Sequence, residues 1–119
     1  MKGQCLCGAV AFTVPESREI GVCHCGYCRR WGGGPMLAVH CGTEVQFTGA
    51  EQIGVFASSE WAERAFCTRC GTHLYYKLLA TGEHFIPAGS FESGAYGRTV
   101  GRPQGRRDHP LLRGRAEHG

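Results

Sequence analysis

Three cysteines within six residues are the feature that most constrains this chain. Cys23, Cys25 and Cys28 stand in the stretch Cys-His-Cys-Gly-Tyr-Cys. A short turn can direct three sulfurs at one point, and a set of thiolates forms a site for a soft metal ion. A closed structural zinc site uses four protein ligands, whereas a catalytic zinc keeps one position open. The triplet therefore predicts either an open metal site or half of a zinc ribbon whose fourth ligand lies elsewhere.

Two close pairs of cysteines resemble the halves of a second metal site. They are Cys5-Leu-Cys7 and Cys67-Thr-Arg-Cys70, and a glycine follows each pair. A glycine at this position permits a turn in which backbone amides face sulfur. If both pairs bind one zinc ion, the metal joins segments about sixty residues apart. Alternatively, each pair is incidental, or one of them completes the triplet, because spacing alone does not settle the pairing.

Cys41 is the only isolated cysteine among the eight in the chain. It is most simply a small buried residue, although it could also supply the fourth ligand of the triplet. No apolar run follows the N-terminus, and no stretch approaches the ~20 apolar residues of a membrane span. We therefore expect no export signal, no membrane association and a cytoplasmic location. In that reducing compartment, closely spaced cysteines are metal ligands more often than disulfides.

The positive charge of the chain is concentrated at its C-terminal end. Residues 1–93 hold seven Lys and Arg against eight acids, whereas residues 94–119 hold six Arg against two acids, and the total is +3. The body therefore has no basic field for nucleic acid, which is not an expected partner. After Tyr96 the chain has no Phe, Trp or Tyr and few branched apolar residues. We expect residues 94–119 to form a flexible Arg- and Gly-rich tail.

The apolar pattern predicts short β-strands. Alternation or short apolar runs mark residues 10–14, 36–39, 45–47, 52–57, 62–66, 74–79 and 84–88, the last two as a hairpin. A turn is expected at Gly49, and one helical turn could follow Cys28 before the glycine run 32–34 and Pro35 end it. The chain is predicted to form one mainly β domain, residues 1–93, of short antiparallel strands tied by metal-binding turns.

Taken together, these residues resemble the glutathione-dependent formaldehyde-activating enzyme (GFA) family, whose members have a β-tent fold. The matching stretches, in family order, are residues 3–8, 23–29, 48–49, 58–59, 64–72 and 89–91. The resemblance implies a structural zinc ion on Cys5, Cys7, Cys67 and Cys70. It implies a catalytic zinc ion on Cys23, Cys25 and Cys28. It also implies a carbon–sulfur lyase that joins formaldehyde and glutathione to S-(hydroxymethyl)glutathione.

The triplet could prepare a thiol for addition to an aldehyde. A zinc ion with three thiolate ligands has a position for a substrate thiol, which then loses its proton near neutral pH. Arg29 and Arg30 directly follow the triplet and could pair with the carboxylates of glutathione, or lie in a solvated turn. Water or His73, which follows the second cysteine pair, could supply a proton to the oxyanion. Tyr27 and Trp31 either pack in the core or line a pocket beside the metal.

A different class of function also fits the cysteines. The chain could be a non-catalytic zinc module that binds protein or nucleic acid, although the near-neutral body disfavours nucleic acid. The triplet could also hold an iron–sulfur centre.

The resemblance ends at the C-terminus. Family members continue with an aromatic segment and a Lys-Pro, where residues 97–107 here are rich in Arg and Gly. We hypothesise a reading-frame change or truncation, which sequencing of the gene locus tests. An intact family segment absent from every reading frame would count against it. Loss of a last strand would expose a sheet edge and favour a homodimer.

Overall fold

The computed structural model describes residues 1–17 and 20–92, which form nine short strands, one α-helix and two 3-10 turns. The strands are β1 (Lys2–Gln4), β2 (Ala11–Thr13), β3 (Ile20–Cys23), β4 (Met36–Gly42), β5 (Gln46–Thr48), β6 (Ile53–Phe56), β7 (Ala62–Cys67), β8 (His73–Leu78) and β9 (His84–Pro87). The helix is α1 (Gly26–Gly32), and the 3-10 turns are η1 (Ala50–Gln52) and η2 (Ala88–Ser90). The prediction of a mainly β domain is confirmed, while the tail predicted for residues 94–119 lies outside the described residues.

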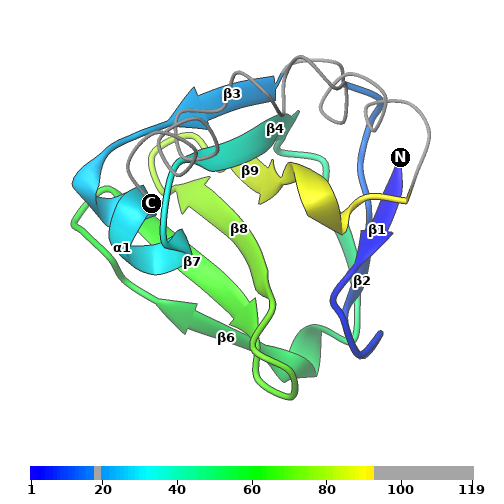
Figure 1. The fold of residues 1–119 in the computed structure, drawn as a ribbon. Coiled ribbons are helices and arrows are strands. Elements are labelled where there is room, and N and C mark those ends of the chain that lie inside the picture. The colour runs from blue at the N-terminus through cyan, green and yellow to red at the C-terminus, as the bar shows by residue number, and fades with distance from the viewer. Residues whose placement is uncertain (18–19, 93–119) are drawn as a thin grey trace, which may run out of the picture.

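The strands form two antiparallel sheets (Figure 1). The smaller sheet has the order β1-β2-β5, and the larger has the order β3-β4-β9-β8-β7-β6. In Figure 1, β1 and β2 stand on one side of the molecule and α1 on the other. The core lies between the sheets. Phe12 of β2 and Val10 just before that strand pack in one buried cluster with Val39, Leu74 and Ile86 of the larger sheet.

The larger sheet separates core residues from site residues by simple alternation. Successive side chains of a strand point to opposite faces of the sheet. Its core-facing side chains include Val39, Cys41, Ala65, Cys67, Tyr75 and Ile86. Its opposite face carries Ala38, His40, Arg64, Tyr76 and Phe85, which line a cavity. The sheet therefore packs against the protein core with one face and offers the other to a ligand.

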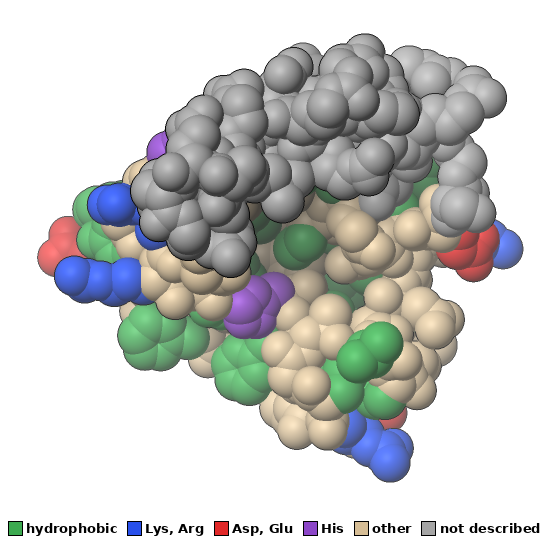
Figure 2. All heavy atoms as spheres, viewed as in Figure 1, with side chains coloured by type: hydrophobic (Ala, Val, Ile, Leu, Met, Phe, Trp, Pro, Cys, Tyr) green, Lys and Arg blue, Asp and Glu red, His purple; other side chains and the backbone are tan. Residues whose placement is uncertain are grey.

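The surface shown in Figure 2 has its charged side chains at the periphery. Hydrophobic side chains, a histidine side chain and atoms of neither charged type surround the hollow near the centre of this face. In the described part of the chain, no helix has the length and apolar character needed to cross a bilayer, and α1 itself has seven residues.

Each of the seven predicted strand segments overlaps a strand, but β1, β3 and the start of α1 were not predicted. The helix was expected only after Cys28, yet it begins at Gly26 because Cys25 caps it and accepts a hydrogen bond from the Cys28 backbone N–H. Ser, Thr, Asp and Asn are the usual capping residues, so a cysteine cap gives no clear signal in a sequence. The helix ends at Gly32, and Gly33, whose φ is 85°, caps it within the predicted glycine run.

Gly49 confirms the predicted turn and permits a close backbone contact. Its φ is 79°, in the left-handed region that favours glycine, and a Cβ atom there would lie 1.9 Å from the carbonyl oxygen of Ala9. Gly42 also has a positive φ, 69°, but a Cβ atom on it would meet no heavy atom within 4 Å. A side chain at either position would strain the backbone, but only at Gly49 would its Cβ atom also collide with a neighbouring atom.

Replacing Gly49 with alanine should lower the free energy of unfolding more than replacing Gly42 does. Both changes place an L-residue in the left-handed region, which costs about 1–2 kcal/mol. Only Gly49→Ala also forces the Ala9 carbonyl to move. Denaturant titration followed by tryptophan fluorescence measures both changes. Equal losses would show that the contact at Gly49 relaxes freely and would contradict this account of the turn.

Candidate functional site

The two cysteine pairs come together in one cluster. The sulfurs of Cys5, Cys7, Cys67 and Cys70 all lie within 4.8 Å of one another. The Cys5 and Cys7 sulfurs are 3.7 Å apart, and those of Cys7 and Cys67 are 3.9 Å apart. Tetrahedral zinc with Zn–S bonds of about 2.3 Å places its sulfurs about 3.8 Å apart. The cluster therefore fits a zinc ion, and neither pair completes the triplet.

Backbone amides support this four-cysteine cluster from both turns. The Val10 N–H donates to the Cys5 sulfur at 3.3 Å, and the Arg69 N–H donates to the Cys67 sulfur at 3.4 Å. The glycine after each pair has a φ of 82°, as the sequence pattern predicts. Such N–H donors stabilise sulfur in its thiolate form.

Thr72 links the two turns and was missed by the sequence reasoning. Its hydroxyl oxygen accepts from the Leu6 N–H at 3.0 Å and lies 3.1 Å from the Cys70 sulfur. The Thr72 side chain, aided by backbone donors, lowers the pKa of the Cys70 thiol to about 5. Cys70 is therefore a ready thiolate ligand.

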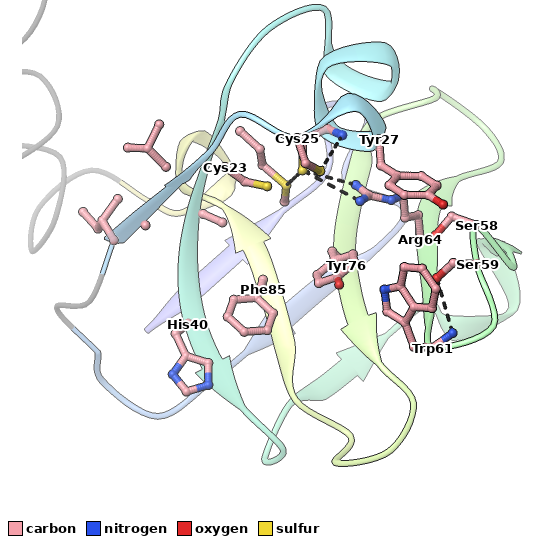
Figure 3. Close-up of a pocket in the computed structure, with 16 residues that line it drawn as sticks. Cys23, Cys25, Tyr27, His40, Ser58, Ser59, Trp61, Arg64, Tyr76 and Phe85 are labelled. Carbon is pink, nitrogen blue, oxygen red and sulfur yellow. Dashed lines mark hydrogen bonds between the residues drawn. The ribbon is translucent and has the colours of Figure 1, made fainter.

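The sulfurs of Cys23, Cys25 and Cys28 form the second cluster, again within 4.8 Å of one another. Cys23 ends β3, Cys25 caps α1, and Cys28 lies in the first turn of α1 (Figure 3). The Cys28 backbone N–H donates to the Cys25 sulfur at 3.4 Å and lowers the pKa of that thiol to about 7. In the described part of the chain, no fourth Cys, His, Asp or Glu joins this triplet.

Cys41 is a small buried residue and not the fourth ligand of the triplet. It is 4% exposed, lies in the core cluster, and its thiol donates to the Val39 carbonyl oxygen at 3.3 Å. Burial raises the pKa of the Cys41 thiol to about 11, so it stays protonated. The sequence left open whether Cys41 is a buried core residue or a metal ligand. Its position on the core face of β4 shows that it is a core residue.

A cavity of about 650 Å³ adjoins the triplet (Figure 3). It lies on the face of the larger sheet that points away from the protein core. All three cysteines of the triplet line it. Its other walls include Ile20, Val22, Tyr27, Met36, Ala38, His40, Ser58, Ser59, Trp61, Arg64, Tyr76 and Phe85. A group bound to the triplet therefore has space beside it for a small molecule.

Arg64 is the main site residue that the sequence reasoning missed. It extends from β7 toward the triplet (Figure 3), is 4% exposed, and donates from both Nη atoms to the Cys28 sulfur at 3.7 and 3.8 Å. Its guanidinium carbon lies 4.6, 5.0 and 5.9 Å from the ring centroids of Tyr76, Trp31 and Tyr27. The aromatic faces thus hold the cation against the sulfur.

The buried charge of Arg64 has no carboxylate partner among residues 1–17 and 20–92. Its Nε atom also has no hydrogen-bond partner there. A buried guanidinium needs an anion nearby, because burial of an unpaired charge is costly. Burial raises the pKa of the Cys28 thiol to about 12 although Arg64 lowers it, so the anion that pairs with Arg64 would form when a metal ion binds the triplet. A charged residue three positions before Cys67 in an apolar strand pattern was the available signal.

Comparison with known proteins agrees with this arrangement. A family model described as glutathione-dependent formaldehyde-activating enzyme matches residues 1–104. This chain belongs to the GFA family. The resemblance stated from the matching stretches of the sequence is therefore confirmed.

Three individual proteins are similar to this chain. An uncharacterized lyase of Schizosaccharomyces pombe is 40% identical over 93 residues, covering 76% of this chain and 68% of the relative. A putative glutathione-dependent formaldehyde-activating enzyme of Halomonas elongata is 31% identical over 85 residues, covering 63% and 54%. A crystal structure of a Rhodobacter sphaeroides protein has a TM-score of 0.69 and 26% identity, covering 86% of this chain and 96% of that chain.

Three further residues suggested by the sequence lie away from the cavity beside the triplet. Arg29 and Arg30 are exposed on α1 and do not line it, so their pairing with glutathione carboxylates stays a prediction. His73 stacks on Trp31 with ring centroids 4.0 Å apart and lines a second cavity. Burial, and then the charge of Arg64, lowers the pKa of His73. Tyr27, in contrast, does wall the cavity.

Replacing Cys67 with alanine should remove one bound zinc ion and destabilise the fold, whereas Cys41→Ala should retain both ions. The wild-type chain is expected to hold two zinc ions, one in each cluster. Both substituted residues are buried, so the loss of core volume is comparable, at about 1 kcal/mol. The additional loss in Cys67→Ala comes from the metal.

Metal content by mass spectrometry and denaturant titration of protein purified without added zinc measure these effects. A chelator should withdraw the ion of the triplet before that of the four-cysteine cluster. Equal zinc content in the Cys67 and Cys41 variants would contradict the assignment of the four-cysteine cluster.

Proposed function

We propose that this chain is a zinc-dependent carbon–sulfur lyase that joins an aldehyde to a thiol or cleaves the resulting adduct. Membership in the GFA family supports a glutathione-related lyase, and glutathione and formaldehyde are therefore the first substrates to test. The observation that carries the proposal is a triplet of cysteines, with no fourth ligand among the described residues, that opens into a cavity.

The two clusters would have different roles. Cys5, Cys7, Cys67 and Cys70 form a complete set of four thiolates, which suits a structural zinc ion. Cys23, Cys25 and Cys28 would hold a second zinc ion and leave a position for the substrate. When bound there, zinc supplies positive charge that stabilises a substrate thiolate near neutral pH.

Arg64 would position Cys28 and balance charge at the triplet. Three thiolates and an incoming thiolate outweigh the charge of one divalent ion, so an adjacent guanidinium lowers the cost of collecting them. The two N–H donors that reach the Cys28 sulfur also fix the direction of its lone pairs. Arg64 is a positioning residue in this proposal, since its Nη donors reach a ligand.

Tyr76 would donate the proton in this reaction. It lines the same cavity as the triplet, and burial raises the pKa of its hydroxyl, so it keeps its proton at neutral pH. When the thiolate sulfur forms a bond to the aldehyde carbon, the electron pair of the carbonyl moves to oxygen. That oxygen then takes the proton of Tyr76, and solvent returns to Tyr76 the proton that the thiol released on binding. Cleavage of the adduct runs through the same transfers in reverse.

A cytoplasmic location belongs to the same proposal. All eight cysteines are free thiols in the structure. Thiolate ligands require such a reduced state, and the cytoplasm maintains it.

Zinc-loaded protein should accelerate the exchange of formaldehyde with glutathione. Two-dimensional exchange NMR measures the rate with and without protein, because the uncatalysed reaction also proceeds. Cys25→Ser should abolish the acceleration, since it removes a ligand of the triplet, while Cys41→Ala should keep it. No acceleration over the spontaneous rate would contradict the reaction with these substrates.

Arg64→Met should weaken zinc retention at the triplet and lower the rate by about 10- to 100-fold, the usual effect of losing a ligand-supporting contact. Arg64→Lys should show zinc retention and a rate between those of the wild type and Arg64→Met, because lysine keeps the charge but not the paired donors. The exposed Arg69 provides the control, as Arg69→Met leaves the triplet unchanged.

Cobalt substitution separates positioning from a general structural role. The thiolate-to-cobalt absorption bands of the triplet should shift in Arg64→Met and remain in Arg69→Met. Unchanged bands and zinc affinity in Arg64→Met would contradict the role proposed for Arg64.

A further inference from the structure

We infer that the thiol adduct handled at the triplet carries an apolar group, such as a ring or a branched chain, next to its carbon–sulfur bond. The inference rests on the proposed function and deepens it, since it names the class of substrate. The apolar group is attached to the aldehyde carbon or to the sulfur, and the experiment below distinguishes these two sources.

The walls of the cavity beside the triplet are apolar. Its floor is the outer face of the larger sheet, where Ala38, Tyr76 and Phe85 lie, and Met36 stands next to Cys28. These side chains alternate with the core residues of the same strands, so the strand pattern places them on the face opposite the core. A cavity of about 650 Å³ is in the range of small-molecule sites, and a one-carbon aldehyde would fill little of it.

Large apolar side chains also gather at the rim of this cavity. Val22, Tyr27 and Trp61 all line it, yet they are 52%, 47% and 56% exposed. Tyr27 and Trp61 meet edge to face with ring centroids 6.3 Å apart (Figure 3). Neighbouring apolar groups left in water at the mouth of a cavity mark a surface that an apolar ligand covers.

The charges near the cavity do not match the charges of glutathione. Among the described residues that line it, Arg64 and His40 are the basic ones, and none is acidic. Arg64 is buried against Cys28, and His40 lies 2.8 Å from a carboxylate oxygen of Glu83. Two carboxylates and an ammonium group would therefore be buried without partners, which is costly. Charged parts of a substrate would remain outside the mouth, and an apolar part would enter.

Exchange NMR on zinc-loaded protein with three substrate pairs tests the inference. The reference pair is glutathione with formaldehyde. The aldehyde arm is glutathione with 3-methylbutanal, and the thiol arm is benzyl mercaptan with formaldehyde. We expect the acceleration over the spontaneous rate to be at least about tenfold greater in one arm than for the reference pair, as for an apolar group that fills an apolar pocket.

Variants at the rim show whether the cavity causes the preference. In Trp61→Ala, the acceleration measured for the favoured substrate pair should fall close to that of the reference pair. Trp61→Phe should retain most of the difference between the two accelerations. Trp61 is exposed, so both variants are expected to fold. Phe56→Ala is the matched control, because Phe56 is 64% exposed but does not line the cavity.

The outcomes separate this inference from the proposed function. Equal acceleration of all three pairs, or a preference that Trp61→Ala leaves unchanged, would overturn the inference while the lyase function stands. No acceleration of any pair would overturn the lyase function, and the inference with it.

Discussion

Four sulfurs that meet from two distant turns are the constraint on which the rest of this structure depends. Cys5 and Cys7 follow β1, and Cys67 and Cys70 bracket the turn between β7 and β8. Strands of three to seven residues hold little stability by themselves. A metal ion in this cluster would offset the entropy of closing a loop of about sixty residues. It would also tie the smaller sheet to β7.

The position of β7 then links the structural cluster to the candidate active site. Arg64 and Cys67 are three residues apart on this strand, so their side chains point to opposite faces. Cys67 enters the four-cysteine cluster on the core side, and Arg64 reaches Cys28 on the cavity side. One strand thus supports both clusters, and a change in its register would disturb both.

The sequence predicted the strands better than it predicted the site. Alternating apolar residues are a local signal, and the strands around Phe12, Val39 and Ile86 follow it. The strand that ends at Cys23 carries no buried residue and therefore gave no such signal. Arg64 was seen only as part of a motif, because its local signal, a charge within an apolar strand pattern, does not show which distant group its side chain meets.

The sequence by itself determined the mainly β class, through its apolar alternation, and the family, through the cysteine clusters and the stretches around them. Spacing also marked seven cysteines as candidate metal ligands, but only the structure shows that the two pairs combine into one group of four. The thiolates that bind one metal ion must lie close together, and here several of them are also close in the chain, so their spacing can be recognised in the sequence. Only the tertiary structure decided that Cys41 is a core residue, that Arg64 donates to the Cys28 sulfur, and that a cavity adjoins the triplet. These features join strands far apart in the chain, and only folding brings such side chains into contact.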